Sequence, residues 1–214
     1  MKVEKILHNV YLIDKKTIAT KSSYGSHYGE KILLNEFREW IPYRSKLAAV
    51  FLKGYLVNIK PDWKILYLGA ASGTTVSHLS DIIDKGIIYA VEYSAKPFLK
   101  FIELAKERKN IIPILEDASK PWMYSGIVEE VDFVYQDIAQ KNQVEIFKLN
   151  CKIFLKERGE GIIMVKARSI DSTVDPEIVF NRVVKELSKD FKILRYGTLE
   201  PFHKDHVFVH VRLS

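Results

Sequence analysis

The stretch Lys64-Ile-Leu-Tyr-Leu-Gly69-Ala-Ala-Ser-Gly73-Thr74-Thr75-Val-Ser-His-Leu-Ser-Asp81 joins an apolar, strand-like run to a helix-like pattern through a turn bounded by two glycines. Gly69 and Gly73 allow the backbone to turn tightly, which brings free N–H groups and a helix N-terminus close to a ligand. The spacing is not G-x-G-x-x-G, and no lysine follows as in G-x-x-x-x-G-K-[ST], so a nicotinamide dinucleotide and a nucleoside triphosphate both fit poorly. We expect a different nucleotide-like cofactor at this turn.

Apolar runs and helical patterns alternate along the rest of the chain. Short runs that are apolar on both faces, as a parallel sheet covered by helices requires, predict strands at residues 65–68, 87–91, 111–115, 131–135 and 161–165. Amphipathic spacing predicts helices at residues 74–83, 95–109, 140–156 (ended by Gly159) and 175–189. The runs 191–199 and 206–213 are too close together for a crossover helix and predict an antiparallel hairpin. The pattern indicates an α/β, Rossmann-like fold whose mostly parallel sheet ends in a C-terminal antiparallel hairpin strand.

The first part of the chain has a different pattern. Loose alternation over residues 1 to about 35 predicts a small N-terminal β-rich extension. Pro42 suits the first position of a helix and Gly54 a C-terminal cap, so we expect a linking helix between them. We therefore divide the chain into an N-terminal β meander with its linking helix, residues 1–54, and a main α/β domain, residues 55–214.

The composition is that of a globular protein with a modest basic excess. The 33 Lys and Arg residues exceed the 27 Asp and Glu residues, and the formal net charge of +6 suits a polyanionic partner such as nucleic acid. The single cysteine, Cys151, excludes an internal disulfide, and its apolar helical surroundings indicate a buried, inert thiol. No apolar stretch is long enough to span a membrane, and the N-terminus has no signal-peptide pattern, so we expect a cytoplasmic protein without a membrane partner.

Three acids stand at the carboxyl ends of successive predicted strands, the edge at which open α/β folds bind ligands. Glu92 follows the glycine turn by about 20 residues, a position from which a carboxylate accepts hydrogen bonds from ribose hydroxyls. Asp117 can accept from the exocyclic amine of an adenine, and Asp137 ends the next strand. Each acid alone would more often be a capping or surface residue. Together they indicate adenine plus ribose without a pyrophosphate cradle, which points to S-adenosyl-L-methionine.

Longer motifs in the chain resemble the fibrillarin family. They are Pro42-Tyr-Arg-Ser-Lys-Leu-Ala-Ala49, Gly69-Ala-Ala-Ser-Gly-Thr-Thr-Val-Ser-His78, Val91-Glu-Tyr-Ser94, Asp117-Ala118, Tyr135-Gln-Asp-Ile-Ala-Gln140, Met164-Val-Lys-Ala-Arg-Ser-Ile170 and His203-Lys-Asp-His206. The resemblance covers essentially the whole chain in order. The sequence does not show the Gly/Arg-rich N-terminal extension of eukaryotic fibrillarins, so we expect the archaeal, fibrillarin-like form. The resemblance implies that residues 55–214 are an S-adenosylmethionine-dependent methyltransferase domain, which methylates ribose 2′-hydroxyls of RNA within a box C/D ribonucleoprotein.

The resemblance also implies how the cofactor is shared among the strand ends. Glu92 would hold the ribose with Tyr93 beside it, Asp117 and Ala118 would bracket the adenine, and residues 137–140 would hold the methionine end. The full predicted cofactor set is Gly69, Ala71, Gly73, Thr74, Thr75, Glu92, Tyr93, Asp117, Ala118, Asp137, Ile138, Ala139 and Gln140.

The resemblance also implies a catalytic Lys-Asp-Lys-His set, which consists of Lys46, Asp137, Lys166 and His206. We expect no metal ion in this set. Elementary chemistry supports such a set, because the enzyme must align oxygen, methyl and sulfur and manage one proton. Repulsion between two nearby lysines and their desolvation would favour a neutral amine. We therefore predict that Lys166 accepts the proton or orients the hydroxyl and that Asp137 orients the lysines. Lys46 and His206 would position the substrate.

The chain has few residues that suggest direct reading of RNA bases. Four cations could line a groove for one phosphate track: Arg44, Lys46, Arg168 and Lys204. They are few contacts for an enzyme that would select its RNA site by itself. The resemblance implies that a box C/D guide RNA selects the nucleotide on rRNA or tRNA by base pairing and that a Nop-domain scaffold protein carries the enzyme. A third, kink-turn-binding, ribosomal-protein-like subunit would bind the guide.

Two other functions remain open from the sequence. One is a methyltransferase of the same fold that acts on protein glutamine or on a small molecule. The basic charge balance and the pair of Lys46 and Lys166 argue against a small molecule. The other is a non-catalytic scaffold that has kept the fold, against which the intact cofactor and Lys-Asp-Lys-His sets argue.

Overall fold

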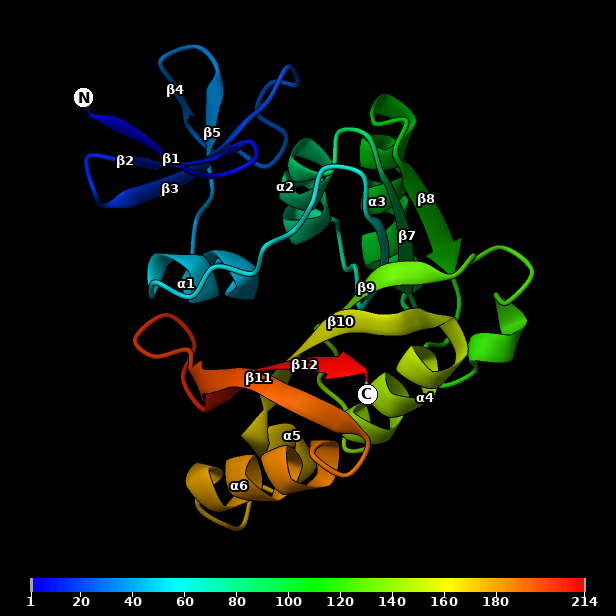
Figure 1. Cartoon of the computed structure of the whole chain (residues 1–214). Helices are drawn as coiled ribbons and strands as arrows, with labels where there is room; N and C mark the ends of the chain where they lie inside the picture. Colours follow the sequence, from blue (N-terminus) through cyan, green and yellow to red (C-terminus); the bar gives the residue numbers. More distant parts are fainter. Residues whose placement is uncertain (1, 214) are drawn as a thin grey trace.

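A seven-stranded sheet forms the centre of the protein, as a computed structural model that describes residues 2–213 shows (Figure 1). Its strand order is β11-β12-β10-β9-β6-β7-β8. The strands are β6 (Lys64–Leu68), β7 (Ile87–Glu92), β8 (Ile111–Leu115), β9 (Val131–Gln136), β10 (Leu155–Lys166), β11 (Phe191–Thr198) and β12 (His206–Leu213). Neighbours from β10 to β8 pair in parallel, whereas β12 is antiparallel to both β10 and β11. The predicted fold class and the C-terminal antiparallel hairpin strand are therefore confirmed.

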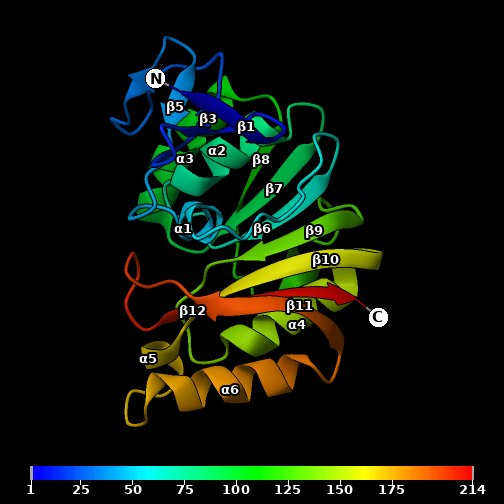
Figure 2. The same cartoon turned by 60° about the vertical axis from the view of Figure 1, so that its left-hand side comes forward.

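Helices cover both faces of this sheet (Figure 2). On one face lie α1 (Lys46–Leu52), α2 (Thr74–Ile82) and α3 (Ala95–Glu107), whose buried residues share one hydrophobic cluster with the sheet. On the other face lie α4 (Gln143–Phe154) and α6 (Pro176–Leu187), which belong to a second cluster. Two short helices were not predicted, the 3₁₀-helix η1 (Pro121–Met123) and α5 (Ala167–Ile170). None of the helices in residues 2–213 combines the length and the apolar character needed to cross a membrane.

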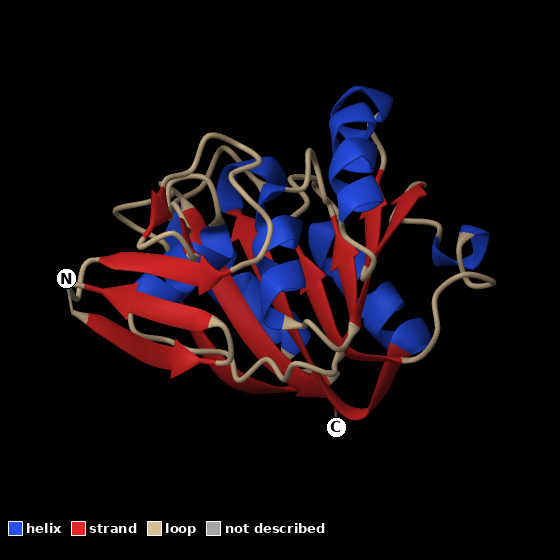
Figure 3. Cartoon of the chain, turned by 90° about the horizontal axis from the view of Figure 1, so that it is seen from above, coloured by secondary structure: helices blue, strands red, loops and turns tan. Residues whose placement is uncertain are grey.

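The N-terminal strands form a separate antiparallel sheet in the order β1-β2-β3-β5-β4 and gather at one side of the molecule (Figure 3). They are β1 (Val3–Leu7), β2 (Val10–Ile13), β3 (Thr17–Lys21), β4 (Ile32–Leu33) and β5 (Phe37–Glu39). Ile18 and Trp40 are buried in the same hydrophobic cluster as Val76 and Leu79 of α2. The β-rich extension is thus confirmed, and its core is continuous with that of the main sheet. The proposed division after residue 54 stays a prediction.

The linking helix begins later than predicted. Pro42 lies in a turn, and α1 begins at Lys46 with Ser45 as its N-cap, whose Oγ accepts a hydrogen bond from the Ala48 amide at 3.4 Å. The prediction was wrong because proline suits both a first helical position and a turn, and serine is the stronger N-cap. Gly54 follows the helix with a φ of +86°, the left-handed conformation expected after a C-terminus.

Strand β10 is longer than predicted and takes residues that were expected to be helical. Helix α4 ends at Phe154, and β10 begins at Leu155 without an intervening loop. The pairing with β9 shifts between Leu155 and Glu160, and Arg158 within this bulge has a φ of +59°. Apolar residues at helical spacing continue into Leu155, so periodicity could not separate the helix from the strand. Cys151 is buried on α4, and burial raises the pKa of its thiol well above the ordinary value.

Candidate active site

A cavity of about 280 Å³ opens at the carboxyl ends of β6, β7, β8 and β9. Parallel strands end together at this edge, so the loops that follow them converge on one place. Most of the predicted cofactor residues line the cavity, which adds Val91 and Glu116 to the set. Its lining residues are Gly69, Ala71, Val91, Glu92, Tyr93, Glu116, Asp117, Ala118, Asp137, Ile138, Ala139 and Gln140.

Gly69 brings two strand ends into contact beneath this cavity. Its φ is +86°, and a Cβ atom added to it would lie 2.4 Å from the backbone oxygen of Asp137. The amide of Asp137 in turn donates a hydrogen bond to the carbonyl of Leu68 at 2.9 Å. A side chain at position 69 would therefore both strain the turn and push Asp137 away.

Glu92 holds the glycine turn in place through its carboxylate. Oε2 accepts a hydrogen bond from the Ala71 amide and Oε1 accepts one from the Ser94 amide, both at 2.7 Å. Ala71 itself has a left-handed φ of +49°, a conformation that alanine rarely adopts. Each carboxylate oxygen has a further lone pair, so Glu92 can support the loop and still accept hydrogen bonds from a vicinal diol.

Asp117 presents one free carboxylate oxygen to the cavity. Its Oδ1 accepts hydrogen bonds from the Ser119 hydroxyl at 2.7 Å and the Ser119 amide at 2.9 Å, and these bonds lower the pKa of Asp117 below its ordinary value. Within residues 2–213 its Oδ2 has no hydrogen-bond partner. This ionised side chain is suited to accept from an amine of a ligand.

The predicted residues Gly73, Thr74 and Thr75 do not line the cavity. Gly73 caps α2 with a φ of +93°, and a Cβ there would meet the ring of Phe101 at 2.6 Å, so its small size serves packing against α3. The buried Thr75 donates its hydroxyl to Ser45 Oγ at 2.9 Å and thereby ties α2 to the N-cap of α1. The structure does not bring these three positions into the cavity wall.

Lys46 and Asp137 form a close ion pair at the same edge. Lys46 Nζ donates to Oδ1 and Oδ2 of Asp137 at 2.7 and 2.8 Å, across 91 positions of sequence. The two side chains are 18% and 23% exposed, so solvent reaches the pair but does not surround it. Asp137 also lines the cavity at the strand ends, and the ion pair therefore places the Lys46 ammonium beside that cavity.

Two histidines lie close to this ion pair, one of which sequence reasoning did not assign to the site. His206 Nδ1 donates to the carbonyl of Lys204 at 2.6 Å, which leaves Nε2 as an acceptor. His203 Nε2 donates to the carbonyl of Pro42 at 2.8 Å, and the two imidazole rings are 5.8 Å apart. Burial, with the positive charge of Lys46, lowers the pKa of both histidines below the ordinary value. Both rings are therefore neutral at pH 7.

Lys166 ends β10 directly opposite His206 in the antiparallel register of β12. Its amide donates to Oε1 of the buried Gln143 at 3.2 Å, which fixes the backbone. Its side chain is exposed and makes no hydrogen bond or ion pair within the described part of the chain. The predicted desolvation of this lysine is therefore wrong, and Asp137 contacts one lysine, Lys46, rather than orienting both.

Two buried tyrosines that the sequence did not single out support the site from below. Tyr67 of β6 and Tyr135 of β9 are register partners, and their rings stack at 4.4 Å. Burial, together with the nearby charge of Asp137, raises the pKa of Tyr67, so its hydroxyl stays protonated. The strand that carries Tyr135 continues directly into Asp137, which couples this stack to the ion pair.

The predicted RNA-binding cations differ in how free they are. Arg168 donates from Nε to Asp205 at 3.2 Å and from Nη1 to the carbonyl of Ser172 at 3.0 Å, so it braces a loop. Arg44 is exposed and spends one nitrogen on the carbonyl of Tyr28 at 3.1 Å. Lys204 is exposed. Arg44 and Lys204 are thus better placed than Arg168 to meet a phosphate.

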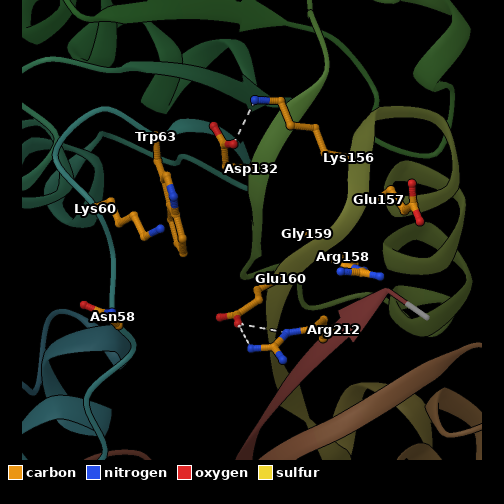
Figure 4. A pocket seen from close by; sticks show the side chains of 10 residues that line it. All are labelled: Asn58, Lys60, Trp63, Asp132, Lys156, Glu157, Arg158, Gly159, Glu160 and Arg212. Atoms are coloured by element: carbon orange, nitrogen blue, oxygen red, sulfur yellow. Dashed lines mark hydrogen bonds and ion pairs between the residues drawn. The ribbon is translucent and has the colours of Figure 1, made fainter.

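A second pocket lies at the opposite edge of the same sheet, where β6 begins and β12 ends (Figure 4). Its charged residues largely neutralise one another. Lys156 donates to Asp132 at 2.8 Å and Arg212 Nη2 donates to Glu160 at 2.5 Å. The groups that fit a nucleoside, and the ion pair of Lys46 and Asp137, are all at the other edge. Within residues 2–213, no group of three or more His, Cys, Asp and Glu side chains is placed to hold a metal ion.

Comparison with known proteins identifies similar chains over the full length. The model of the fibrillarin family matches residues 1–214. A fibrillarin-like rRNA/tRNA 2′-O-methyltransferase of Archaeoglobus fulgidus is 64% identical over 208 residues, which are 97% of this chain and 98% of that protein.

Solved structures agree with the sequence matches. The crystal structure of a fibrillarin/Nop5p complex superposes with a TM-score of 0.96 at 64% identity, covering 99% of this chain and 100% of that one. Aeropyrum pernix fibrillarin, solved with natively bound S-adenosyl-L-methionine, gives a TM-score of 0.84 at 39% identity and covers 99% of both chains. The predicted resemblance is confirmed by these matches.

Proposed function

Because the chain belongs to the fibrillarin family, we propose that it transfers a methyl group from S-adenosyl-L-methionine to ribose 2′-hydroxyls of rRNA and tRNA. The observation that carries this function is the Lys46–Asp137 ion pair on the wall of a cavity with free acceptors for a nucleoside. A bound sulfonium cofactor supplies an electrophilic methyl group, so the protein has to hold the acceptor oxygen in line with it.

The cavity fits the adenosine and methionine parts of this cofactor. Glu92 accepts from the ribose hydroxyls through lone pairs that the Ala71 and Ser94 amides leave free. Asp117 accepts from the adenine amine through Oδ2, and the exposed Tyr93, which also lines the cavity, lies beside the ribose. The segment from Asp137 to Gln140 holds the methionine end.

The four predicted catalytic residues divide the work of the transfer step. The RNA 2′-oxygen forms a bond to the methyl carbon as the bond from that carbon to sulfur breaks, and the hydroxyl proton must leave. We assign Lys166 to orienting the hydroxyl or, where bound RNA desolvates its exposed side chain, to accepting the proton. His206, held neutral with Nε2 as an acceptor, positions the same hydroxyl. Asp137 fixes Lys46, whose ammonium meets the adjacent phosphate.

Substitution of the central acid and the strand-end lysine tests this assignment. We predict that Asp137→Ala and Lys166→Ala each abolish methyl transfer in a complex reconstituted with guide RNA and scaffold protein, while circular dichroism stays unchanged. Lys192→Ala, at an exposed position on β11, is the matched control and keeps full activity. Near wild-type methyl incorporation by either active-site variant, with cofactor still bound, would contradict the assignment.

The partners follow from the same proposal. The fibrillarin/Nop5p complex supports a Nop-domain scaffold for this chain as well. A box C/D guide RNA would select the nucleotide, and a kink-turn-binding, ribosomal-protein-like subunit would hold the guide. The sparse free cations at the site support this division, because Arg168 is engaged within the protein.

Omission of single components tests the need for partners. We expect the isolated chain to bind S-adenosyl-L-methionine in calorimetry and to methylate RNA poorly. Addition of the scaffold and a guide should restore methylation at the one nucleotide that the guide specifies. Efficient, site-specific methylation by the chain alone would contradict the proposal.

A further inference from the structure

An exposed tyrosine stands beside the proposed catalytic residues. Tyr43 precedes Lys46 in the turn that leads into α1, and the residue is 65% exposed. Its ring meets the partly buried ring of Phe202 edge to face, with centroids 5.1 Å apart and planes at 70°. This contact holds the exposed ring of Tyr43 beside the proposed active site, and tyrosine, with an apolar ring and a polar hydroxyl, is a residue enriched at binding interfaces.

The backbone on both sides of Tyr43 is held in place. The carbonyl of Pro42 accepts from His203 Nε2 at 2.8 Å, and the Arg44 side chain donates to the carbonyl of Tyr28 at 3.1 Å. The turn is closed by the Arg44 amide, which donates to the carbonyl of Ile41 at 3.0 Å. An aromatic side chain on a fixed backbone loses little conformational entropy when it binds.

The loop that carries Phe202 is attached to the same region. It joins β11 to β12 and lies next to α1 in both side views (Figures 1 and 2). Lys53 Nζ of the α1 C-cap donates to the carbonyl of Glu200 at 2.5 Å, and the loop continues through His203 into His206. Tyr43 and Phe202 thus form an aromatic pair beside the proposed catalytic residues.

We infer that Tyr43 enters the minor groove of the guide–substrate duplex, with its ring against a ribose next to the methylated nucleotide and its hydroxyl bonded to the 2′-hydroxyl of that ribose. This inference rests on the proposed function. In A-form RNA the 2′-hydroxyls line a wide, shallow minor groove, so any protein that methylates one of them must approach that groove. The phenol ring and hydroxyl of tyrosine match the apolar ribose faces and the 2′-hydroxyls of this groove. Such a contact does not depend on the base sequence.

Paired substitutions in protein and RNA test this contact in the reconstituted complex under single-turnover conditions. Tyr43→Ala should lower the rate at limiting RNA by about tenfold, because it removes both the contact of the ring with the ribose and the hydrogen bond of the hydroxyl. Tyr43→Phe should lower it by about threefold, the scale of losing one hydrogen bond. Tyr196→Ala, which removes another exposed tyrosine on β11, should leave the rate unchanged. Affinity for S-adenosyl-L-methionine and for the scaffold should be the same in all variants.

Single 2′-deoxy substitutions in the RNA locate the bonded ribose. At one nucleotide flanking the target, the deoxy substitution should slow the wild-type complex by the same factor as Tyr43→Phe and should not slow Tyr43→Phe further. Additive effects at every position, a wild-type rate for Tyr43→Ala, or weakened scaffold binding by that variant would each overturn the inference. Failure of the proposed function itself would differ, because the wild-type complex would then methylate no 2′-hydroxyl.

Discussion

At the scale of single residues, the site depends on atoms that no sequence pattern displays. The sequence predicted a glycine turn at Gly69 because glycine is flexible. The structure adds a steric reason for a glycine at this position, since the backbone oxygen of Asp137 occupies the space that a Cβ atom would need. Glu92 was chosen as a ribose acceptor, and it also holds the amide of the strained Ala71. His203 reaches Pro42 across 161 positions, a separation at which a single sequence carries no signal. Local chemistry was therefore predictable, whereas contacts between distant loops were not.

Replacing Gly69 should damage both stability and cofactor binding. In Gly69→Ala the left-handed φ alone costs about 1–2 kcal/mol of unfolding free energy, and the Cβ displaces Asp137. We expect a lower midpoint in chemical denaturation and at least tenfold weaker cofactor binding, on the order of 1.4 kcal/mol. Gly126→Ala is the control, because nothing lies within 4 Å of its Cβ. Equal stability and affinity in the two variants would show that the close approach at Gly69 is unimportant.

Replacing Glu92 should affect the cofactor more than the fold. Glu92→Gln removes the charge that we propose accepts the ribose hydroxyls. It also places the new side-chain NH₂ group, a donor, against one of the two backbone N–H groups that Glu92 binds. Hydrogen bonds to a charged group are worth about 1.5–3 kcal/mol, so affinity for S-adenosyl-L-methionine should fall by more than about tenfold. Calorimetry against the exposed control Glu130→Gln measures the difference. Unchanged affinity would remove Glu92 from the cofactor site.

At the scale of elements, α2 connects the N-terminal sheet to the main sheet through buried charges. Arg38 of β5 donates to Glu30 at 2.6 Å and to Asp81 of α2 at 2.7 Å, and Arg108 donates to the other oxygen of Asp81. The four side chains are at most 4% exposed. This network could not be predicted from the sequence, because charged residues are normally expected at the surface.

Breaking this network from the N-terminal side should destabilise the whole protein. Arg38→Met leaves Glu30 and Asp81 buried with less compensation, a situation that typically costs about 3–5 kcal/mol. Guanidinium unfolding would measure the loss as a lower midpoint. Lys21→Met breaks the half-exposed pair with Glu36 and should change the midpoint little. Similar midpoints for the two variants would mean that the buried arginine is dispensable.

Helix and strand positions in the main sheet were mostly predictable, and the exceptions have physical causes. Acids after short apolar runs marked the strand ends correctly at Glu92 and Asp137. The start of α1 was misplaced because the N-cap role of Ser45 competes with the helix-starting preference of Pro42. The bulge before Glu160 was missed because it depends on pairing with β9, which is a property of the sheet rather than of the segment.

At the scale of the whole molecule, buried titratable groups make stability depend on pH. His78 is buried under Trp40, and burial lowers the pKa of its imidazole well below 6.5. Burial alone would raise the pKa of Glu30, but hydrogen bonds from the His27 and Tyr28 amides and from Arg38 outweigh it and hold that pKa at about 2. Both groups therefore bind fewer protons in the folded state than in the unfolded state at acidic pH.

Stability should fall in two stages as the pH is lowered. Below about pH 6.5 the unfolded chain protonates His78 while the folded chain does not, so the unfolding free energy falls. The contribution of Glu30, full above its ordinary value of 4.5, is then lost as the pH falls towards 2. Guanidinium midpoints at pH 7.5, 5.5, 4 and 3 would record both stages, and His78→Asn should flatten the first. A midpoint that is constant from pH 7.5 to 4 would contradict this account.

The position of β12 has a consequence for biosynthesis. Synthesis runs from the N-terminus, so β11 leaves the ribosome before the strand that separates it from β10 exists. The residues that line the proposed cofactor cavity, all between 69 and 140, emerge well before His206, which begins that inserted strand. A nascent chain that stops before β12 carries the proposed cofactor residues but lacks both His206 and the strand that pairs with the edge of β10. The insertion of β12 therefore completes the sheet and the proposed catalytic set in one step, late in the synthesis of the chain.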